Sequence, residues 1–111
     1  MRMWMVPPEE LCDKHLLGEH VECHMFFGAI KKGKSVRGYL EGGLLEPYWL
    51  KQRHEVLAKE MRRRGMKHKS PMRFPKGFKP PGNQLVQYVD PERNRFELIH
   101  LCEECRRRMK P

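Results

Sequence analysis

Ionisable side chains gather in one short stretch near the start of the chain, His15 to Gly28, which reads HLLGEHVECHMFFG. It holds three histidines, two glutamates and a cysteine within an otherwise apolar run. Carboxylates and imidazoles act as general acids and bases, and histidine and thiolate also bind transition metals. The stretch is therefore a candidate for catalysis, for metal binding, or for an ordinary polar helix surface.

The spacing of these residues divides the expected helix into three faces. Side chains three or four positions apart share a face, and the first face carries His15, Glu19, Glu22 and Phe26. We interpret it as the candidate catalytic face. The second face is apolar and is expected to pack in the core: Cys12, Leu16, Cys23, Phe27 and Ile30. His20 and His24 lie on a third face, where exposure or DNA contact is as reasonable as metal binding.

The end of the chain offers a second chemistry, because Cys102 and Cys105 form a C-x-x-C pair. Such a pair resembles half of a tetrahedral zinc site, which needs two more ligands. Cys12 and Cys23 cannot both complete it, since a helix separates them by about 16 Å. One hypothesis is a structural zinc held by Cys102, Cys105, Cys23 and His20. The other is a disulfide or free thiols.

Length and composition indicate one small, basic, folded domain. The chain has 111 residues, 39% hydrophobic and 33% charged, with a net charge of +9. No apolar run reaches the roughly 20 residues of a membrane span, and the first residues lack the apolar core of a signal peptide. We therefore expect a protein of the cytoplasm or nucleoid without membrane contact. The charge favours a nucleic acid partner, although a basic surface with no partner is the simpler alternative.

Two helices are expected to position these groups. The first is predicted from Pro8 to about Ile30, because a proline followed by acids suits a first helical turn. The second is predicted from Glu46 to Gly65, where the cationic MRRRG suits a helix end. Its buried face should carry Leu50, His54, Leu57 and Met61. The loop between the helices, KKGKSVRGYLEGG, is either a simple connector or a phosphate-contacting segment.

The last third of the chain differs in composition. Prolines exclude regular structure from residues 67–83, whose lysines suit an extended segment along the surface or along nucleic acid. QLVQYV and RFELIHL flank the turn-like DPERN, which predicts a β-hairpin. We thus expect a mainly α, single-domain fold with a helical core at 1–66, the basic segment at 67–83, and a β-hairpin with the C-x-x-C tail at 84–111.

Two stretches, EELCDKHLLGEHVECHMFFGAIKKG and QRHEVLAKEMRRRGM, combine order, spacing and residue type over both expected helices. They resemble the pyrimidine dimer DNA glycosylases, the endonuclease V family of the T-even phage type. The resemblance covers about residues 1–66 and implies a mainly helical DNA repair glycosylase with AP-lyase activity. In that family the protein's α-amine attacks C1′ of the damaged nucleotide, releases the base as an imine forms, and cleaves the strand by β-elimination.

Carried onto this chain, the resemblance makes the Met1 amine the nucleophile and Glu22 the carboxylate that stabilises the cationic sugar and moves protons. It also matches His15 to a histidine of the family's DNA-contacting active-site face, which makes His15 the third expected catalytic residue. The role of the amine as a nucleophile also follows from its pKa, independently of the resemblance. An α-amine has a pKa of about 7.7–8.0, against about 10.4 for lysine, so an appreciable fraction is neutral and nucleophilic at pH 7. Catalysis of this kind requires no cofactor.

Two features depart from the family pattern. Val21 and Met25 stand where the family has substrate-gripping arginines, and the family's aromatic C-terminal segment is absent. The substrate therefore need not be a pyrimidine dimer. The residues expected to contact nucleic acid instead are Arg2, His20, His24, Lys31, Lys32, Lys34, Arg37 and Arg53.

Two functions remain open at this point. We favour a monomeric enzyme that acts on a damaged or modified pyrimidine in double-stranded DNA. The alternative is a non-catalytic protein that binds structured RNA, for example on the ribosome. The charge, the proline-lysine segment and the missing arginines would suit that alternative.

Overall fold

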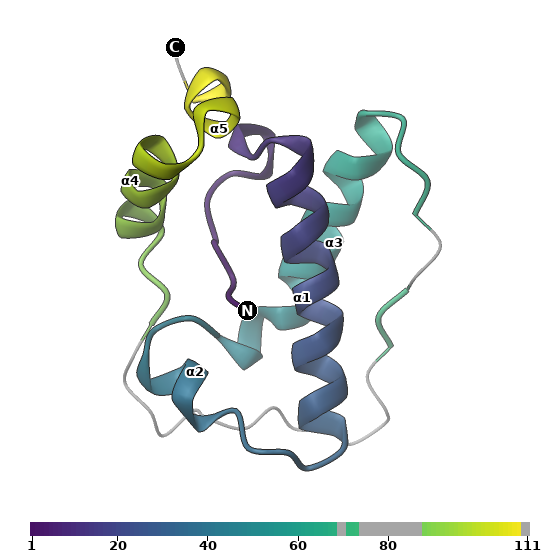
Figure 1. Cartoon of the computed structure of the whole chain (residues 1–111). Helices are drawn as coiled ribbons and strands as arrows, with labels where there is room; N and C mark the ends of the chain where they lie inside the picture. The colour runs from purple at the N-terminus through teal and green to yellow at the C-terminus, as the bar shows by residue number, and fades with distance from the viewer. Residues whose placement is uncertain (69–70, 74–87, 110–111) are drawn as a thin grey trace.

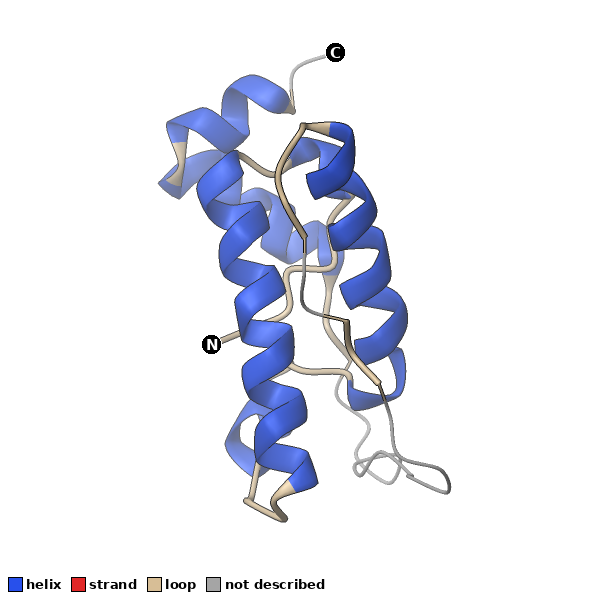
Figure 2. Ribbon diagram, turned by 90° about the vertical axis from the view of Figure 1, so that its right-hand side faces the viewer, coloured by secondary structure: helices blue, strands red, loops and turns tan. Residues whose placement is uncertain are grey.

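Residues 1–68, 71–73 and 88–109 are described by the computed structural model, and within them the chain forms helices and loops without a strand. The expected mainly α fold is confirmed. The two long helices are α1 (Asp13–Lys31) and α3 (Leu50–Arg63), which lie side by side (Figures 1 and 2). No helix in the described part of the chain has the length and apolar character needed to cross a membrane.

Both long helices begin later than predicted, because a short 3-10 turn opened by a proline precedes each of them. These turns are η1 (Pro8–Glu10) and η2 (Pro47–Trp49). The loop between the long helices contains one further short helix, α2 (Arg37–Glu41), which was not predicted. Gly33 ends α1 with a φ of 73°, in the left-handed region that glycine adopts without steric cost.

The predicted C-terminal β-hairpin is wrong. In its place stand α4 (Pro91–Leu101) and α5 (Glu103–Arg108). The residues interpreted as a turn start α4, because the Asp90 carboxylate accepts two backbone N–H groups of the first turn at 3.0 and 3.2 Å. An aspartate cap followed by proline is a helix start. Residues 84–87 of the expected hairpin, and 69–70 and 74–83 of the basic segment, lie outside the described residues.

The core lies where α1, α3 and the N-terminal segment meet. The predicted buried face of α3 is confirmed, since no member exceeds 3% exposure: Leu50, His54, Leu57 and Met61. Leu16 and Cys23 of α1 are buried as predicted, but Glu19 and Phe26, from the face interpreted as catalytic, are fully buried too. The buried surface of α1 is therefore wider than its apolar face.

A buried ion pair joins the two long helices. The Arg53 guanidinium donates from Nε and Nη2 to the two carboxylate oxygens of Glu19, at 2.6 and 2.9 Å. The side chains of Arg53 and Glu19 are 6% and 0% exposed. Such a bidentate pair satisfies both charged groups within the protein. The fold thus gives Arg53 an internal partner in place of the expected nucleic acid contact.

Substituting Arg53→Met should lower the free energy of unfolding by about 3–5 kcal/mol, because the Glu19 carboxylate would stay buried without its partner. The double variant Glu19→Leu/Arg53→Met should recover most of this loss, since apolar side chains then replace both charges. Urea unfolding of the two variants measures the difference. A single variant as stable as the wild type would contradict the burial of this pair.

Candidate active site and metal centre

The N-terminal segment, residues 1–7, is fixed between α1 and α4 and brings the chain start to the side of α1 (Figure 1). The Met3 N–H donates to the Leu44 carbonyl oxygen at 2.7 Å. The Asn94 side-chain amide donates to the Trp4 carbonyl oxygen at 2.8 Å. The side chains of Met3 and Val6 are buried in the core. Backbone bonds and apolar burial together hold the segment in place.

The Met1 amine and the Glu22 carboxylate meet at the end of this segment. The amine nitrogen lies 3.9 Å from Glu22 Oε1, and the two side chains are 21% and 27% exposed. Two of the three residues that the sequence assigns to catalysis, Met1 and Glu22, therefore lie together at a partly open position. The third, His15, lies beside the thiols of Cys12, Cys102 and Cys105.

Arg2 anchors the chain start to α4. Its guanidinium donates to Glu97 Oε2 at 2.9 Å and to Asn94 Oδ1, and it lies 4.0 Å from the centre of the Trp4 ring. A half-buried guanidinium with three such partners has an internal positioning role. The Arg2 side chain is therefore directed to partners within the protein, and not to the surface, where the predicted nucleic acid contact would require it.

The groups around Glu22 shift the pKa of its carboxyl group in opposite directions. Burial raises the pKa of Glu22, and the nearby Glu19 carboxylate raises it further. The Met1 amine and the Arg2 N–H lower it, but the net shift is upward. A carboxyl group with a raised pKa exchanges protons more readily near neutral pH than an ordinary glutamate does.

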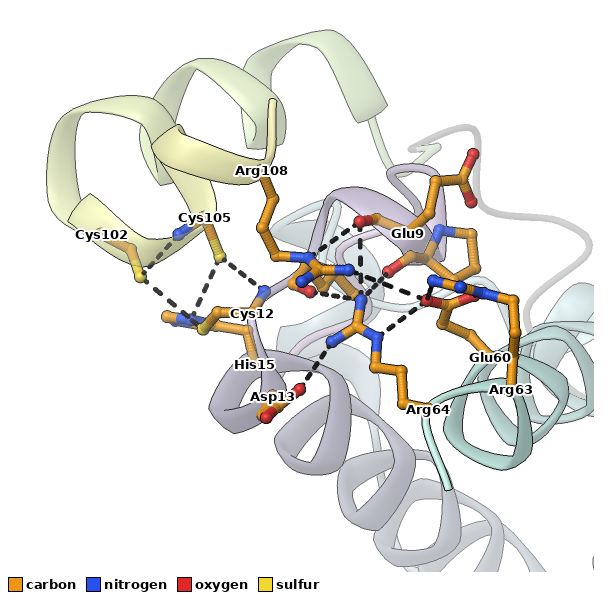
Figure 3. Close-up of polar contacts among 12 residues, drawn as sticks. Glu9, Cys12, Asp13, His15, Glu60, Arg63, Arg64, Cys102, Cys105 and Arg108 are labelled. Atoms are coloured by element: carbon orange, nitrogen blue, oxygen red, sulfur yellow. Dashed lines mark hydrogen bonds and ion pairs between the residues drawn. The ribbon is translucent and has the colours of Figure 1, made fainter. Parts of the chain in front are cut away.

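A second cluster joins the two ends of the described chain (Figure 3). The thiols of Cys12, Cys102 and Cys105 and one ring nitrogen of His15 all lie within 4.8 Å of one another. The ligand set predicted from the sequence differs, because Cys23 and His20 do not approach the C-x-x-C pair. Cys23 is a core thiol whose pKa is raised by burial and by Glu19. The missed signal is the C-x-x-H pair in CDKH, which has metal-ligand spacing.

The distances in this cluster suit zinc. Tetrahedral coordination with Zn–S bonds of about 2.3 Å separates two sulfurs by about 3.8 Å, and a sulfur from a ring nitrogen by about 3.5 Å. Cys12 Sγ lies 3.8 Å from Cys102 Sγ. His15 Nδ1 lies 3.2 Å from Cys12 Sγ and 3.5 Å from Cys105 Sγ. The Cys12 N–H donates to Cys105 Sγ at 3.3 Å, and such bonds stabilise thiolate ligands.

Arg64, just after α3, fixes the start of α1 beside this cluster (Figure 3). Its guanidinium donates to the Leu11 carbonyl oxygen at 2.7 Å and to Asp13 Oδ1 at 2.9 Å. It also pairs with Glu60 at 2.8 Å. Hydrogen bonds from Arg63 and Arg64 lower the pKa of Glu60 to about 2. Arg64 thus fixes Leu11 through its backbone carbonyl and Asp13 through its side chain, one on either side of Cys12.

Four histidines from α1, α3 and the segment after α3 form two close pairs, His20 with His68 and His24 with His54. His20 Nε2 lies 2.8 Å from His68 Nε2, and His24 Nε2 lies 3.0 Å from His54 Nε2. Burial, reinforced by the other imidazoles, lowers the pKa of His20 to about 4. His20 is 6% exposed and His54 is fully buried. The third face of α1 is therefore partly internal, and the fold does not present His20 to a nucleic acid.

The remaining candidates for nucleic acid contact are exposed at one end of α1. Lys31, Lys32, Lys34 and Arg37 are all exposed. The Arg37 guanidinium pairs with Glu41 at 2.6 Å. Val21 and Met25, on either side of Glu22 along α1, are 53% and 51% exposed. Apolar side chains thus occupy the surface where the resemblance would place arginines.

The family model of pyrimidine dimer DNA glycosylase matches residues 1–74. The chain belongs to this family, which places it among DNA repair glycosylases and makes DNA its expected partner. The match contains Met1, Glu22 and both long helices, whereas α4 and α5 lie beyond it. No curated protein and no solved structure gave a significant match.

Asn94→Ala should release the chain start from α4, because it removes the bonds to the Met3 and Trp4 carbonyl oxygens and to Arg2. We expect a loss of about 1–3 kcal/mol in unfolding free energy and faster hydrogen exchange in residues 1–7. The matched control is Phe96→Ala, on the exposed side of the same helix. Unchanged exchange at residues 1–7 in Asn94→Ala would show that Asn94 does not hold the segment.

Proposed function

We propose that this protein is a DNA glycosylase with AP-lyase activity, in which the Met1 α-amine is the nucleophile and Glu22 is the catalytic carboxylate. The observation that carries the proposal is the approach of the Met1 amine to Glu22, at 3.9 Å, within the part of the chain that matches the family. The substrate class we propose is a damaged or modified pyrimidine in double-stranded DNA.

The reaction begins with attack of the neutral amine on C1′ of the damaged nucleotide. The glycosidic bond breaks, its electron pair leaves with the base, and Glu22 accepts a proton from the amine. Glu22 then gives this proton to the ring oxygen O4′ as the C1′–O4′ bond breaks, and the nitrogen lone pair forms the C1′=N bond of the imine. Loss of a proton from C2′ then expels the 3′ phosphate by β-elimination. Water hydrolyses the imine and returns the free amine.

The surroundings of Glu22 suit this chemistry. The carboxylate is partly withdrawn from water, so its charge interacts more strongly with the cationic sugar than it would in bulk solvent. Its raised pKa favours proton transfer near neutral pH. The exposed Lys31, Lys32, Lys34 and Arg37 would contact the phosphate backbone. Activity on DNA would place the protein in the cytoplasm or nucleoid.

We also propose that Cys12, His15, Cys102 and Cys105 hold a structural zinc ion. Four protein ligands fill tetrahedral coordination and leave no open position for substrate, which is typical of a structural role. The ion would fasten α5 to the start of α1. His15 would then act as a metal ligand, in place of the DNA-contacting role that the resemblance implies. No step of the proposed reaction uses the ion.

Borohydride trapping on abasic-site DNA tests the catalytic proposal. The wild type should form a covalent adduct that maps to the N-terminal peptide. Glu22→Gln should lower the trapping rate by about 10²-fold or more, because it removes the group that accepts the proton. Glu92→Gln, which changes an exposed acid on α4, is the control. Absence of an adduct on abasic and ultraviolet-irradiated DNA, with tight binding to structured RNA, would favour the non-catalytic alternative.

Cobalt substitution tests the zinc proposal. The purified protein should contain zinc, and the cobalt form should show thiolate-to-cobalt charge-transfer absorption. Cys102→Ser/Cys105→Ser should lose this absorption and melt at a lower temperature, because the ion no longer joins α5 to α1. Cys23→Ala, which removes a core thiol, should keep the absorption. A disulfide between Cys12 and Cys102, found by mass mapping in place of metal, would refute the proposal.

A further inference from the structure

We propose that His20, His54 and His68, with His24 beside them, form a second metal site that binds a divalent, imidazole-preferring transition metal ion such as Zn²⁺. The site is distinct from the cysteine cluster and shares none of its residues. It does not depend on the catalytic proposal.

The first support is the convergence of separate segments on one point. His20 and His24 are four positions apart on α1, a spacing that puts two imidazoles on the same side of a helix. His54 comes from α3, and His68 from the segment that leaves α3 after Gly65. One ring nitrogen from each of His20, His54 and His68 lies within 4.8 Å of the others. Three segments therefore supply ligand atoms to a single small volume.

The second support is the fit of the donor atoms to a metal ion. Zn–N bonds of about 2.0–2.1 Å in a tetrahedral site separate two ring nitrogens by about 3.3 Å. The Nε2 atoms of His20 and His68 are 2.8 Å apart, and those of His24 and His54 are 3.0 Å apart. A shift of about half an ångström would open the His20–His68 pair to coordination. His24 is not in the group of three and reaches the site through its contact with His54. Neutral imidazole suits zinc, copper and nickel, and the site has neither thiolate nor carboxylate among its close donors.

The third support is a carboxylate behind one of the ligands. Glu55 Oε1 lies 3.3 Å from His54 Nδ1. A carboxylate that accepts a hydrogen bond from the second ring nitrogen fixes the tautomer of a histidine ligand and increases its basicity. His54 would then present Nε2 to the ion.

An ion at this position would fasten the segment that follows α3 onto both long helices. The alternative for the same geometry is a set of neutral imidazoles joined by N–H···N hydrogen bonds. The metal site and the hydrogen-bonded imidazoles can be distinguished experimentally, because only a metal site binds added metal ion stoichiometrically.

The test is a titration with Ni²⁺ of the full-length protein that carries only one equivalent of zinc, enough to fill the cysteine cluster and leave the histidine site open. Calorimetry and the histidine signals in NMR spectra follow the binding. One equivalent should bind, and the paramagnetic ion should broaden the imidazole signals of His20, His54 and His68. His68→Asn, a change in a half-buried loop residue, should weaken binding at least tenfold. His100→Asn, on the exposed side of α4, is the matched control.

Two outcomes would overturn the proposal. One is the absence of a stoichiometric binding event in the folded wild type. The other is equal Ni²⁺ affinity in His68→Asn, His100→Asn and the wild type, which would place the ion elsewhere. The trapping assay on abasic-site DNA is independent of both outcomes, so failure of this site and failure of the catalytic proposal are distinguishable.

Discussion

The packing of the N-terminal segment is the constraint on which the rest of the structure depends. Met3 and Val6 are buried in the core, and the backbone of the segment bonds to Leu44 and to Asn94 of α4. An amine at a chain end is ordinarily mobile, because few contacts order the first residues. Here the buried side chains order it, and the amine lies beside Glu22 as a consequence. The N-terminus is therefore part of the core packing as well as of the candidate site.

The same arrangement explains why α1 carries so many ionisable groups. Its side chains meet α3, the chain start and α5, so few of its faces are open to solvent. Each buried charged or polar side chain of α1 has a partner from a distant segment: Glu19 has Arg53, and His20 has His68. Unpartnered burial of such groups would be costly. The ionisable stretch thus divides into an internal ion pair, an imidazole cluster, a thiol-imidazole cluster and one accessible carboxylate.

Local sequence signals predicted the two long helices and the core face of α3, because proline, glycine and apolar spacing act over a few residues. They did not predict the partners of Glu19 or of the C-x-x-C pair, since Arg53 and Cys12 are far away in sequence and only the fold brings them near. The β-prone composition around residues 84–101 outweighed the capping aspartate at Asp90, which led to the wrong hairpin. The sequence predicted which side of the helix carries Glu22. The short distance between the Met1 amine and the Glu22 carboxylate came only from the structure.

The central claim is that the fold holds the chain's own α-amine at the reaction centre. The most direct measurement adds one glycine before Met1 and compares covalent trapping on abasic-site DNA with that of the native start. One residue moves the amine by up to about 3.6 Å. We predict that trapping falls by about 10²-fold or more while DNA affinity is unchanged, because the displaced amine no longer lies beside Glu22. Undiminished trapping at the new N-terminus would contradict the account.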